Sequence, residues 1–260
     1  HTQGGEVTGS IDESVRHAIT KLAHLHFPAT ERARDNVIRM GEDPAAVHLT
    51  GCPAIDLLAD ETLALRPALF DRPSGVGPAV DPSRPYMIVL QHPVTTEYGD
   101  GFAQISQTLE AVQRIGLQTI WLWPNVDAGS DDVSKGLRMF RERNPSANVH
   151  FYRNFAAEEY ASLLNNAVCI VGNSSSALRE GAYLGVPAVN VGTRQAGREH
   201  GPNVVHALYD AGSIENAIRG QLIRSRYPRS TLFGDGAAGP RIANILAETE
   251  VSIQKRLAYA

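Results

Sequence analysis

The chain has 260 residues, of which 43% are hydrophobic and 20% charged, and its formal net charge is −4. This size supports one large or two modest domains, the charge disfavours a nucleic-acid partner, and no apolar run reaches the length of a membrane span. Its two cysteines, Cys52 and Cys169, are too few for a disulfide framework or a zinc site, which predicts reduced core residues in a cytoplasmic protein.

The predicted elements of residues 1–70 are mainly helical. Residues 11–27 form the first helix, because three apolar side chains recur at helical spacing: Val15, Ile19 and Leu22. Ser10 as N-cap, with Glu13 three residues later, fits a capping box at its start. The elements expected next are a strand edge at Phe27, a helix from Thr30 to Gly41, a short strand over 47–50 and a helix over 53–65.

Residues 71–85, DRPSGVGPAVDPSRP, are rich in proline and glycine, which predicts a linker between two domains. Beyond them, apolar runs alternate with helical segments. The predicted strands are 86–91, 118–123, 148–152, 168–172 and 188–192. The predicted helices between and after them are 100–115, 131–143, 156–166, 213–226 and 238–256. Continuous apolar strands that alternate with helices indicate a parallel sheet covered on both faces.

Polar side chains follow each of these strands. They are His92, Asn125, Asn154, Ser174 and Arg194. Ligands of such sheets bind beyond the carboxyl ends of the strands, so we expect these residues to share one rim.

The sequence GNSSSALRE begins at Gly172, the last residue of a predicted strand, and is predicted to turn into a helix near Ser176. Its hydroxyls and free backbone N–H groups could donate to a phosphate. Glu180 would lie within reach of a ribose. Arg194 and Arg198, which come later in the chain, could also bind the phosphate. The alternative is an ordinary serine-capped helix. No P-loop lysine and no GxGxxG fingerprint is present, which disfavours ATPases and NAD enzymes.

His92 could donate to a phosphate or act as an acid or base, or it could be a loop histidine that only bonds to the backbone. Glu6, Asp12 and Glu13 are candidate acid–base carboxylates. Asp12 and Glu13 could equally be first-turn charges that the helix dipole favours.

Together these segments resemble the hydrolysing UDP-N-acetylglucosamine 2-epimerases of sialic acid and related nonulosonic acid biosynthesis. The matching motifs are HTQGGEVTGSIDESVRHAITKLAHLH, GCPAIDLL, QHPVTTE, WPNVDAGS, GNSSSALREGAYLGVPAVNVGTRQAGRE and FGDGAAGPRI. Each motif alone is weak, but together they are specific and span nearly the whole chain.

The resemblance implies an α/β, GT-B-like fold with two Rossmann-like domains around a cleft, the first of them incomplete at its N-terminus. Residues 1–70 would be the end of that first domain and 71–85 the linker. Residues 86–236 would form the UDP-binding domain, and 237–260 a closing helix that packs back on the first domain. The family also implies a homodimer or homotetramer with no nucleic-acid or membrane partner, and a reaction without metal or redox cofactor.

By the same resemblance, Ser174 and Ser175 would bind the diphosphate of UDP, Glu180 the ribose and Arg194 the anion. Phe155 would contact uracil through its backbone, and His92, perhaps protonated, would lie near the phosphates. The implied catalytic residues are Glu6, Asp12 and His92.

The implied reaction eliminates UDP from UDP-N-acetylglucosamine and hydrates the resulting 2-acetamidoglucal to N-acetylmannosamine. One departure from the family concerns Gln3, where relatives often carry a catalytic glutamate. A neutral amide cannot act as a base, so Glu6, Asp12 or a carboxylate ahead of His1 would do this work, or the protein would be a catalytically silent UDP-sugar binding module. A separate alternative is the same reaction on a UDP-2,4-diacetamido-trideoxyhexose of the legionaminic acid pathway.

Overall fold

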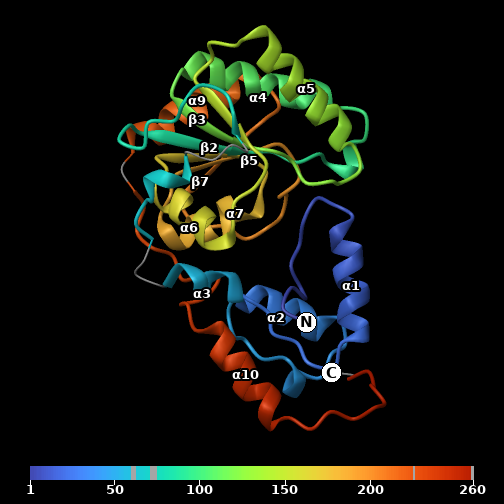
Figure 1. The fold of residues 1–260 in the computed structure, drawn as a ribbon. Coiled ribbons are helices and arrows are strands. Elements are labelled where there is room, and N and C mark those ends of the chain that lie inside the picture. Colours follow the sequence, from blue (N-terminus) through green and yellow to red (C-terminus); the bar gives the residue numbers. More distant parts are fainter. Residues whose placement is uncertain (60–62, 71–74, 225, 259–260) are drawn as a thin grey trace.

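The computed structural model describes residues 1–59, 63–70, 75–224 and 226–258 (Figure 1). Its centre is a seven-stranded sheet in the order β1-β4-β3-β2-β5-β6-β7. The strands are β1 (Gly75–Val76), β2 (Tyr86–Leu90), β3 (Gln118–Leu122), β4 (Val149–Tyr152), β5 (Cys169–Gly172), β6 (Ala188–Val191) and β7 (Val204–Ala207). Strand β1 pairs antiparallel to β4, and all other neighbours are parallel.

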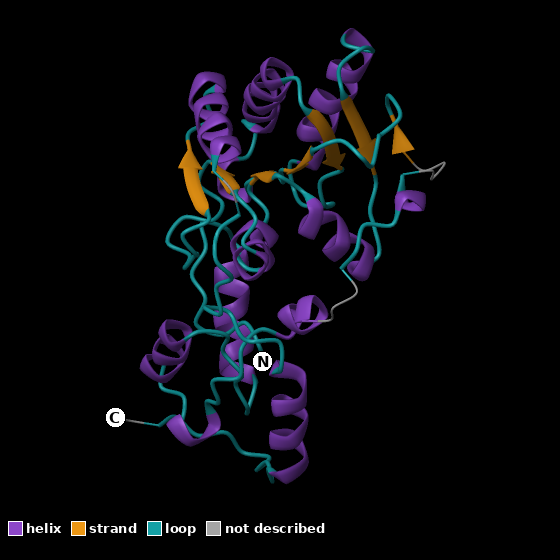
Figure 2. Ribbon diagram, turned by 90° about the vertical axis from the view of Figure 1, so that its left-hand side faces the viewer, coloured by secondary structure: helices purple, strands orange, loops and turns teal. Residues whose placement is uncertain are grey.

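Helices cover both faces of this sheet. One face carries α4 (Gly101–Ile115), α5 (Ser130–Arg143) and α9 (Ala211–Ile223); the other carries α6 (Ala157–Asn166), α7 (Ser175–Leu178) and α8 (Glu180–Leu184) (Figure 1). Figure 2 shows the strands as one layer with helices above and below. Each face has its own apolar core, which is why the inner strands are apolar along their whole length. The predicted α/β, GT-B-like fold class is confirmed.

The remaining helices form a second body beside the sheet. They are α1 (Asp12–Leu22), α2 (Glu31–Arg39) and α3 (Pro53–Ala59), joined by α10 (Ala238–Glu248) from the end of the chain. Helix α10 packs on α3, and the Asp56 carboxylate of α3 accepts the backbone N–H groups of Ala238 and Gly239 at 3.0 and 2.6 Å. The closing helix therefore lies against the N-terminal segment (Figure 1).

Several expectations for residues 1–70 need correction. Glu13 accepts the N–H of Thr8 at 2.8 Å, and Ile11 is the N-cap of α1, so the predicted capping box is wrong. The expected strands near Phe27 and over 47–50 reduce to a single parallel bridge between His26 and Val47. The last predicted helix of this segment ends at Ala59, and residues 60–62 lie outside the described residues.

The apolar stripe of α1 is present but faces solvent. Val15, Ile19 and Leu22 are 53%, 42% and 78% exposed. Helical spacing predicted the shared face correctly, but periodicity alone does not say whether a neighbour covers that face.

Two strands were missed in the sequence. Residues 75–76 of the predicted linker form β1, which is too short for a recognisable pattern, while 71–74 lie outside the described residues. In β7 the two middle residues are exposed, because β7 lies at the edge of the sheet and lacks the continuous apolar run of the inner strands.

The junction between β2 and β5 depends on a glycine. Gly172 has a φ of +127°, and a Cβ atom there would lie 2.1 Å from the carbonyl oxygen of Leu90 on β2.

Gly172→Ala should therefore lower the free energy of unfolding by more than about 1 kcal/mol, measured by urea denaturation at unchanged m-value. Gly220→Ala is the control, because nothing lies within 4 Å of its Cβ position in α9. That change should stabilise by about 0.5–1 kcal/mol. Equal effects at both sites would contradict this reading of Gly172.

Candidate functional site

The strand order places the candidate site between β2 and β5. The chain runs outward from β2 through β3 to β4, then returns to the other side of β2 with β5, β6 and β7. Such a switch point leaves a crevice beyond the carboxyl ends of the two central strands. His92 follows β2 and Ser174 follows β5, so both lie at this crevice.

Asn173 holds the two sides of the crevice together. Its buried side chain accepts the N–H of His92 at 2.7 Å and donates to the carbonyl of His92 at 2.8 Å. Its own carbonyl accepts hydrogen bonds from Gln195 at 2.7 Å and from Arg194 at 3.4 Å. The loops after β2, β5 and β6 are thus locked together. Sequence reasoning missed Asn173, although a polar residue at the end of a buried strand was the available signal.

The imidazole of His92 is buried and held in one tautomer. Its Nδ1 accepts the backbone N–H of Asn125 at 3.2 Å, so the neutral ring carries its proton on Nε2. Burial, together with the nearby positive charge of Arg194, lowers the pKa of His92 to about 4. The suggestion of a protonated His92 is therefore wrong for the site without an anion: the ring is a neutral donor at pH 7.

The serine turn is built differently from the predicted single helix. Ser174 is the N-cap of α7, and its hydroxyl accepts the N–H of Ser176 at 3.3 Å. The helix breaks at Arg179, and α8 begins at Glu180. Helix α7 is only one turn long. Any anion binding here would therefore depend on the serine hydroxyls and backbone N–H groups more than on a long helix dipole.

Two further residues predicted to bind UDP lie close to this turn. The Tyr160 hydroxyl of α6 shares a hydrogen bond of 2.6 Å with Ser176, which brings the segment after Phe155 towards the serines. The N–H of Phe155 donates to the side chain of Asn154 at 2.9 Å. One carboxylate oxygen of Glu180 is buried and has no hydrogen-bond partner among the described residues. A buried acceptor without a donor is costly, so this oxygen is available to a ligand hydroxyl.

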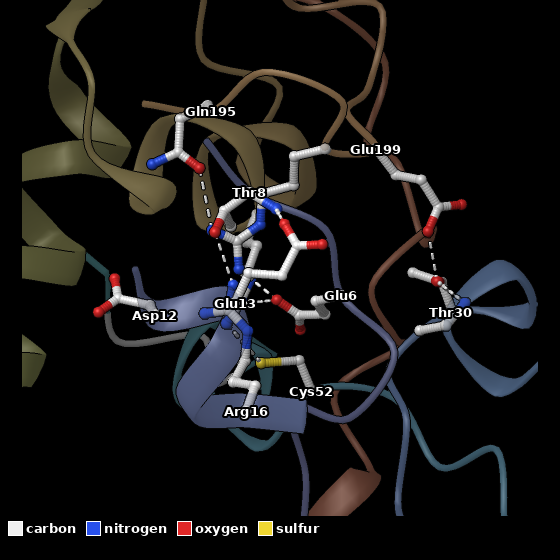
Figure 3. A network of polar contacts seen from close by, with 12 residues as sticks. Glu6, Thr8, Asp12, Glu13, Arg16, Thr30, Cys52, Gln195 and Glu199 are labelled. Atoms are coloured by element: carbon white, nitrogen blue, oxygen red, sulfur yellow. Dashed lines mark hydrogen bonds and ion pairs between the residues drawn. The ribbon is translucent and has the colours of Figure 1, made fainter. Parts of the chain in front are cut away.

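Glu6 lies in a buried cluster of charges (Figure 3). Its carboxylate pairs with the guanidinium groups of Arg179 and Arg198, and its side chain is only 6% exposed. Burial and the neighbouring charge of Arg179 lower the pKa of Arg198 to about 10. Arg16 adds a further positive charge near Glu6. Arg198 was predicted to bind the phosphate. In the structure it pairs with Glu6 across the boundary between the two bodies.

Asp12, by contrast, faces the rim. One oxygen of its half-exposed carboxylate lies 3.9 Å from the Arg194 guanidinium. Asp127, in the loop after β3, lies 3.8 Å from the same nitrogen. The structure therefore brings together His92, Ser174, Ser175, Arg194 and Asp12, while Glu6 is held by Arg179 and Arg198.

Comparisons with known proteins identify the family of the chain. A family model described as UDP-N-acetylglucosamine 2-epimerase matches residues 1–247. The chain belongs to this family. It is 32% identical to the UDP-N-acetylglucosamine 2-epimerase of Neisseria meningitidis serogroup B, over 98% of this chain and 67% of that protein. It is 31% identical to a UDP-N,N'-diacetylbacillosamine 2-epimerase (hydrolyzing) of Legionella pneumophila, over 95% of this chain and 63% of that protein.

Solved structures of UDP-N-acetylglucosamine 2-epimerases share the fold. That of Neisseria meningitidis bound to UDP-GlcNAc superposes with a TM-score of 0.74 at 17% identity, over 96% of this chain and 69% of that one. That of Methanocaldococcus jannaschii, in complex with UDP-GlcNAc and UDP, gives 0.71 at 15% identity, over 96% and 68%. The chain thus spans about two thirds of the length of these epimerases.

Two features are absent from the described residues. No helix in them is long and apolar enough to cross a membrane. No group of three or more His, Cys, Asp or Glu side chains in this part of the chain could hold a metal ion.

The His92 environment predicts a measurable titration. Its pKa is about 4 in the folded protein against 6.5 for the free side chain, so the unfolded chain binds more protons between these values. Stability should therefore fall as the pH drops from 6.5 towards 4. In NMR titrations the His92 resonance should shift with a midpoint near 4, and UDP should move that midpoint upward because its phosphates favour the imidazolium. A midpoint near 6.5 without UDP would contradict the burial argument.

The Glu6 cluster predicts a large loss of stability for a small change. Glu6→Gln leaves Arg179 and Arg198 buried without a counter-charge and should cost about 3–5 kcal/mol in the free energy of unfolding. Glu31→Gln is the control, because Glu31 is 71% exposed and lies 3.5 Å from Arg34. That change should cost less than about 1 kcal/mol. Chemical denaturation measures both variants, and similar small losses would show that the Glu6 pairs contribute little.

Proposed function

We propose that the protein is a hydrolysing UDP-N-acetylglucosamine 2-epimerase that converts UDP-GlcNAc and water into UDP and N-acetylmannosamine. One observation carries the proposal. Asp12 of the N-terminal body lies 3.9 Å from Arg194, and the charge of Arg194 acts on His92 at the switch point of the sheet. Family membership supports an epimerase, and the Legionella relative, described as hydrolysing, supports this type of reaction.

In this proposal UDP binds along the rim. The hydroxyls of Ser174 and Ser175 and the guanidinium of Arg194 hold the diphosphate. The unpartnered oxygen of Glu180 accepts a ribose hydroxyl. The backbone of Phe155, whose N–H donates to the side chain of Asn154, contacts uracil. Solved relatives with UDP-GlcNAc or UDP bound support a UDP-sugar as the substrate.

The chemistry divides into two halves. A base removes the proton at C2 of the sugar while the bond from C1 to UDP breaks, which leaves a 2-acetamidoglucal. Water then adds at C1, and a proton returns to C2 on the opposite face. Negative charge grows on the departing UDP, and groups that already point at the diphosphate stabilise it without reorganisation. Arg194 supplies positive charge, and neutral His92 supplies the Nε2–H.

Of the predicted carboxylates, Asp12 is the one we assign to proton transfer. It is accessible and faces Arg194, whereas Glu6 is buried and held by two arginines. Gln3 is exposed, and its amide cannot take a proton at neutral pH. Glu6 in this proposal is structural, and it stabilises the contact on which the position of α1 depends.

A second candidate substrate follows from the relatives. The same reaction on a UDP-2,4-diacetamido-trideoxyhexose is favoured by the 31% identity to the Legionella enzyme, which is described as acting on UDP-N,N'-diacetylbacillosamine. Both substrates present the same UDP and the same C2 acetamido group to the rim.

Turnover in deuterated water tests the proposal. The full protein, incubated with UDP-GlcNAc and followed by NMR, should release UDP and N-acetylmannosamine that carries deuterium at C2. Turnover of only the diacetamido substrate would select the second candidate. UDP binding without release of UDP from either sugar nucleotide would instead indicate a silent binding module. A product without deuterium at C2 would exclude proton abstraction there.

A further inference from the structure

Gln195 is a buried amide in the loop after β6, and its two ends bond to different parts of the molecule. The residue is only 2% exposed. Its Nε2 donates to the backbone carbonyl of Asn173 at 2.7 Å, and its Oε1 accepts Nη1 of Arg198 at 2.9 Å. Figure 3 shows the Gln195 side chain at the edge of the Glu6 cluster. Hydrogen bonds in such an interior position are costly to lose, because water cannot readily replace them.

The donor end of Gln195 leads to the rim. The Asn173 carbonyl has two lone pairs, and it accepts both Gln195 and, at 3.4 Å, Nη1 of Arg194. The Asn173 side chain holds the backbone N–H and carbonyl of His92 at 2.7 and 2.8 Å. Asn173 can keep His92 and Arg194 in place only while its own peptide group is fixed, and Gln195 makes the shorter of the two side-chain bonds to that group.

The acceptor end of Gln195 leads to the boundary between the two bodies. Arg198 gives Nη1 to Gln195 and Nη2 to the carboxylate of Glu6, which belongs to the N-terminal body. The hydrogen bonds thus form one continuous series across the boundary. Its members, in order, are Glu6, Arg198, Gln195, Asn173 and His92.

An amide suits the middle of this series. The Asn173 carbonyl needs a donor and the Arg198 guanidinium needs an acceptor, and a glutamine side chain offers both. A glutamate at residue 195 would satisfy Arg198 but would set a second acceptor against the carbonyl. An apolar side chain would satisfy neither partner.

We propose that Gln195 is a positioning residue that ties the places of His92 and Arg194 at the rim to the Glu6–Arg198 pair between the bodies. This inference rests on the proposed epimerase function, in which His92 and Arg194 hold the departing diphosphate. Gln195 acts through its neighbours and not on the substrate. The groups that hold the leaving group are then in place when the body that supplies the proposed proton-transfer group is in contact.

The test compares Gln195→Met with Gln221→Met in the full protein. Gln221 of α9 is a matched control, because it is fully buried and uses both ends of its amide. Its Nε2 donates to the carbonyls of Ala188 and Asn203 at 2.8 Å, and its Oε1 accepts the Tyr227 hydroxyl at 2.8 Å. Both changes remove a buried amide with comparable bonds, so both should destabilise the fold, but only the first lies in the series that reaches the rim.

Three quantities are measured for each folded variant: UDP affinity, kcat and the pH midpoint of the His92 resonance. Gln195→Met should weaken UDP binding about 10-fold and lower kcat about 10–100-fold, because small misplacements of groups at a reacting centre have effects of that size. Its His92 midpoint should rise from about 4 towards 6.5 as the ring loses its fixed, buried place. Gln221→Met should leave all three quantities unchanged.

Two further variants separate the links of the series. Gln195→Glu keeps the acceptor for Arg198 and removes the donor to Asn173, so it should lose activity as Gln195→Met does. Glu6→Asp keeps the charge but shortens the side chain, and it should weaken UDP binding in the wild type. In the Gln195→Met background it should add little further loss, because the link is already broken.

Three outcomes overturn the proposal. Effects of Gln195→Met that match those of Gln221→Met show a structural role only, and wild-type activity of Gln195→Glu shows that the donor is not needed. Losses of UDP affinity from Glu6→Asp and Gln195→Met that add in full show that Gln195 does not transmit the contact. Failure of the proposed function has a different signature. The wild type would then release no UDP from either sugar nucleotide, while UDP affinity and the His92 midpoint would still report the positioning.

Discussion

The buried ion pairs of Glu6 with Arg179 and Arg198 are the contact on which the rest of the structure depends. Glu6 belongs to the N-terminal body, and both arginines belong to the sheet body, so the pairs cross the boundary between them. Charges taken out of water are stable only when they are well paired, so these groups tolerate few alternative arrangements. Helix α1 begins six residues after Glu6, and its first residue, Asp12, is thereby held over the rim. Close by, the N–H of Gly9 donates to the Arg194 carbonyl at 3.1 Å.

The sheet body contributes a rim that is organised before any ligand binds. Asn173 joins the loops after β2, β5 and β6, and the Asn125 amide sets the tautomer of His92. Groups that need not move when charge develops stabilise a departing anion most effectively. Burial keeps His92 neutral, so its Nε2–H can donate to phosphate while Arg194 provides the charge. Among the described residues, one buried carboxylate oxygen of Glu180 has no hydrogen-bond donor, so it is available to a ligand hydroxyl.

The two bodies thus divide the work in the proposed reaction. The serine turn, Glu180, His92 and Arg194 all come from the sheet body and hold the leaving group. Asp12 comes from the N-terminal body and faces the sugar. Asp127, from the loop after β3, also lies 3.8 Å from the Arg194 guanidinium.

The sequence by itself determined the inner parallel strands, their alternation with helices and the residues of the rim. These are local properties: a strand buried on both faces must be apolar throughout, and the polar residue that follows it must lie at the sheet edge. Only the tertiary structure decided which charged and polar side chains pair with one another. Glu6 meets Arg179, which lies 173 residues further along the chain, and that contact holds a candidate base in a buried ion pair. Contacts between distant parts of the chain also set the pKa of His92, the neighbours of Arg194 and the exposure of the apolar stripe of α1. Charge state and accessibility depend on which distant groups the fold brings close, and neither residue type nor spacing records that.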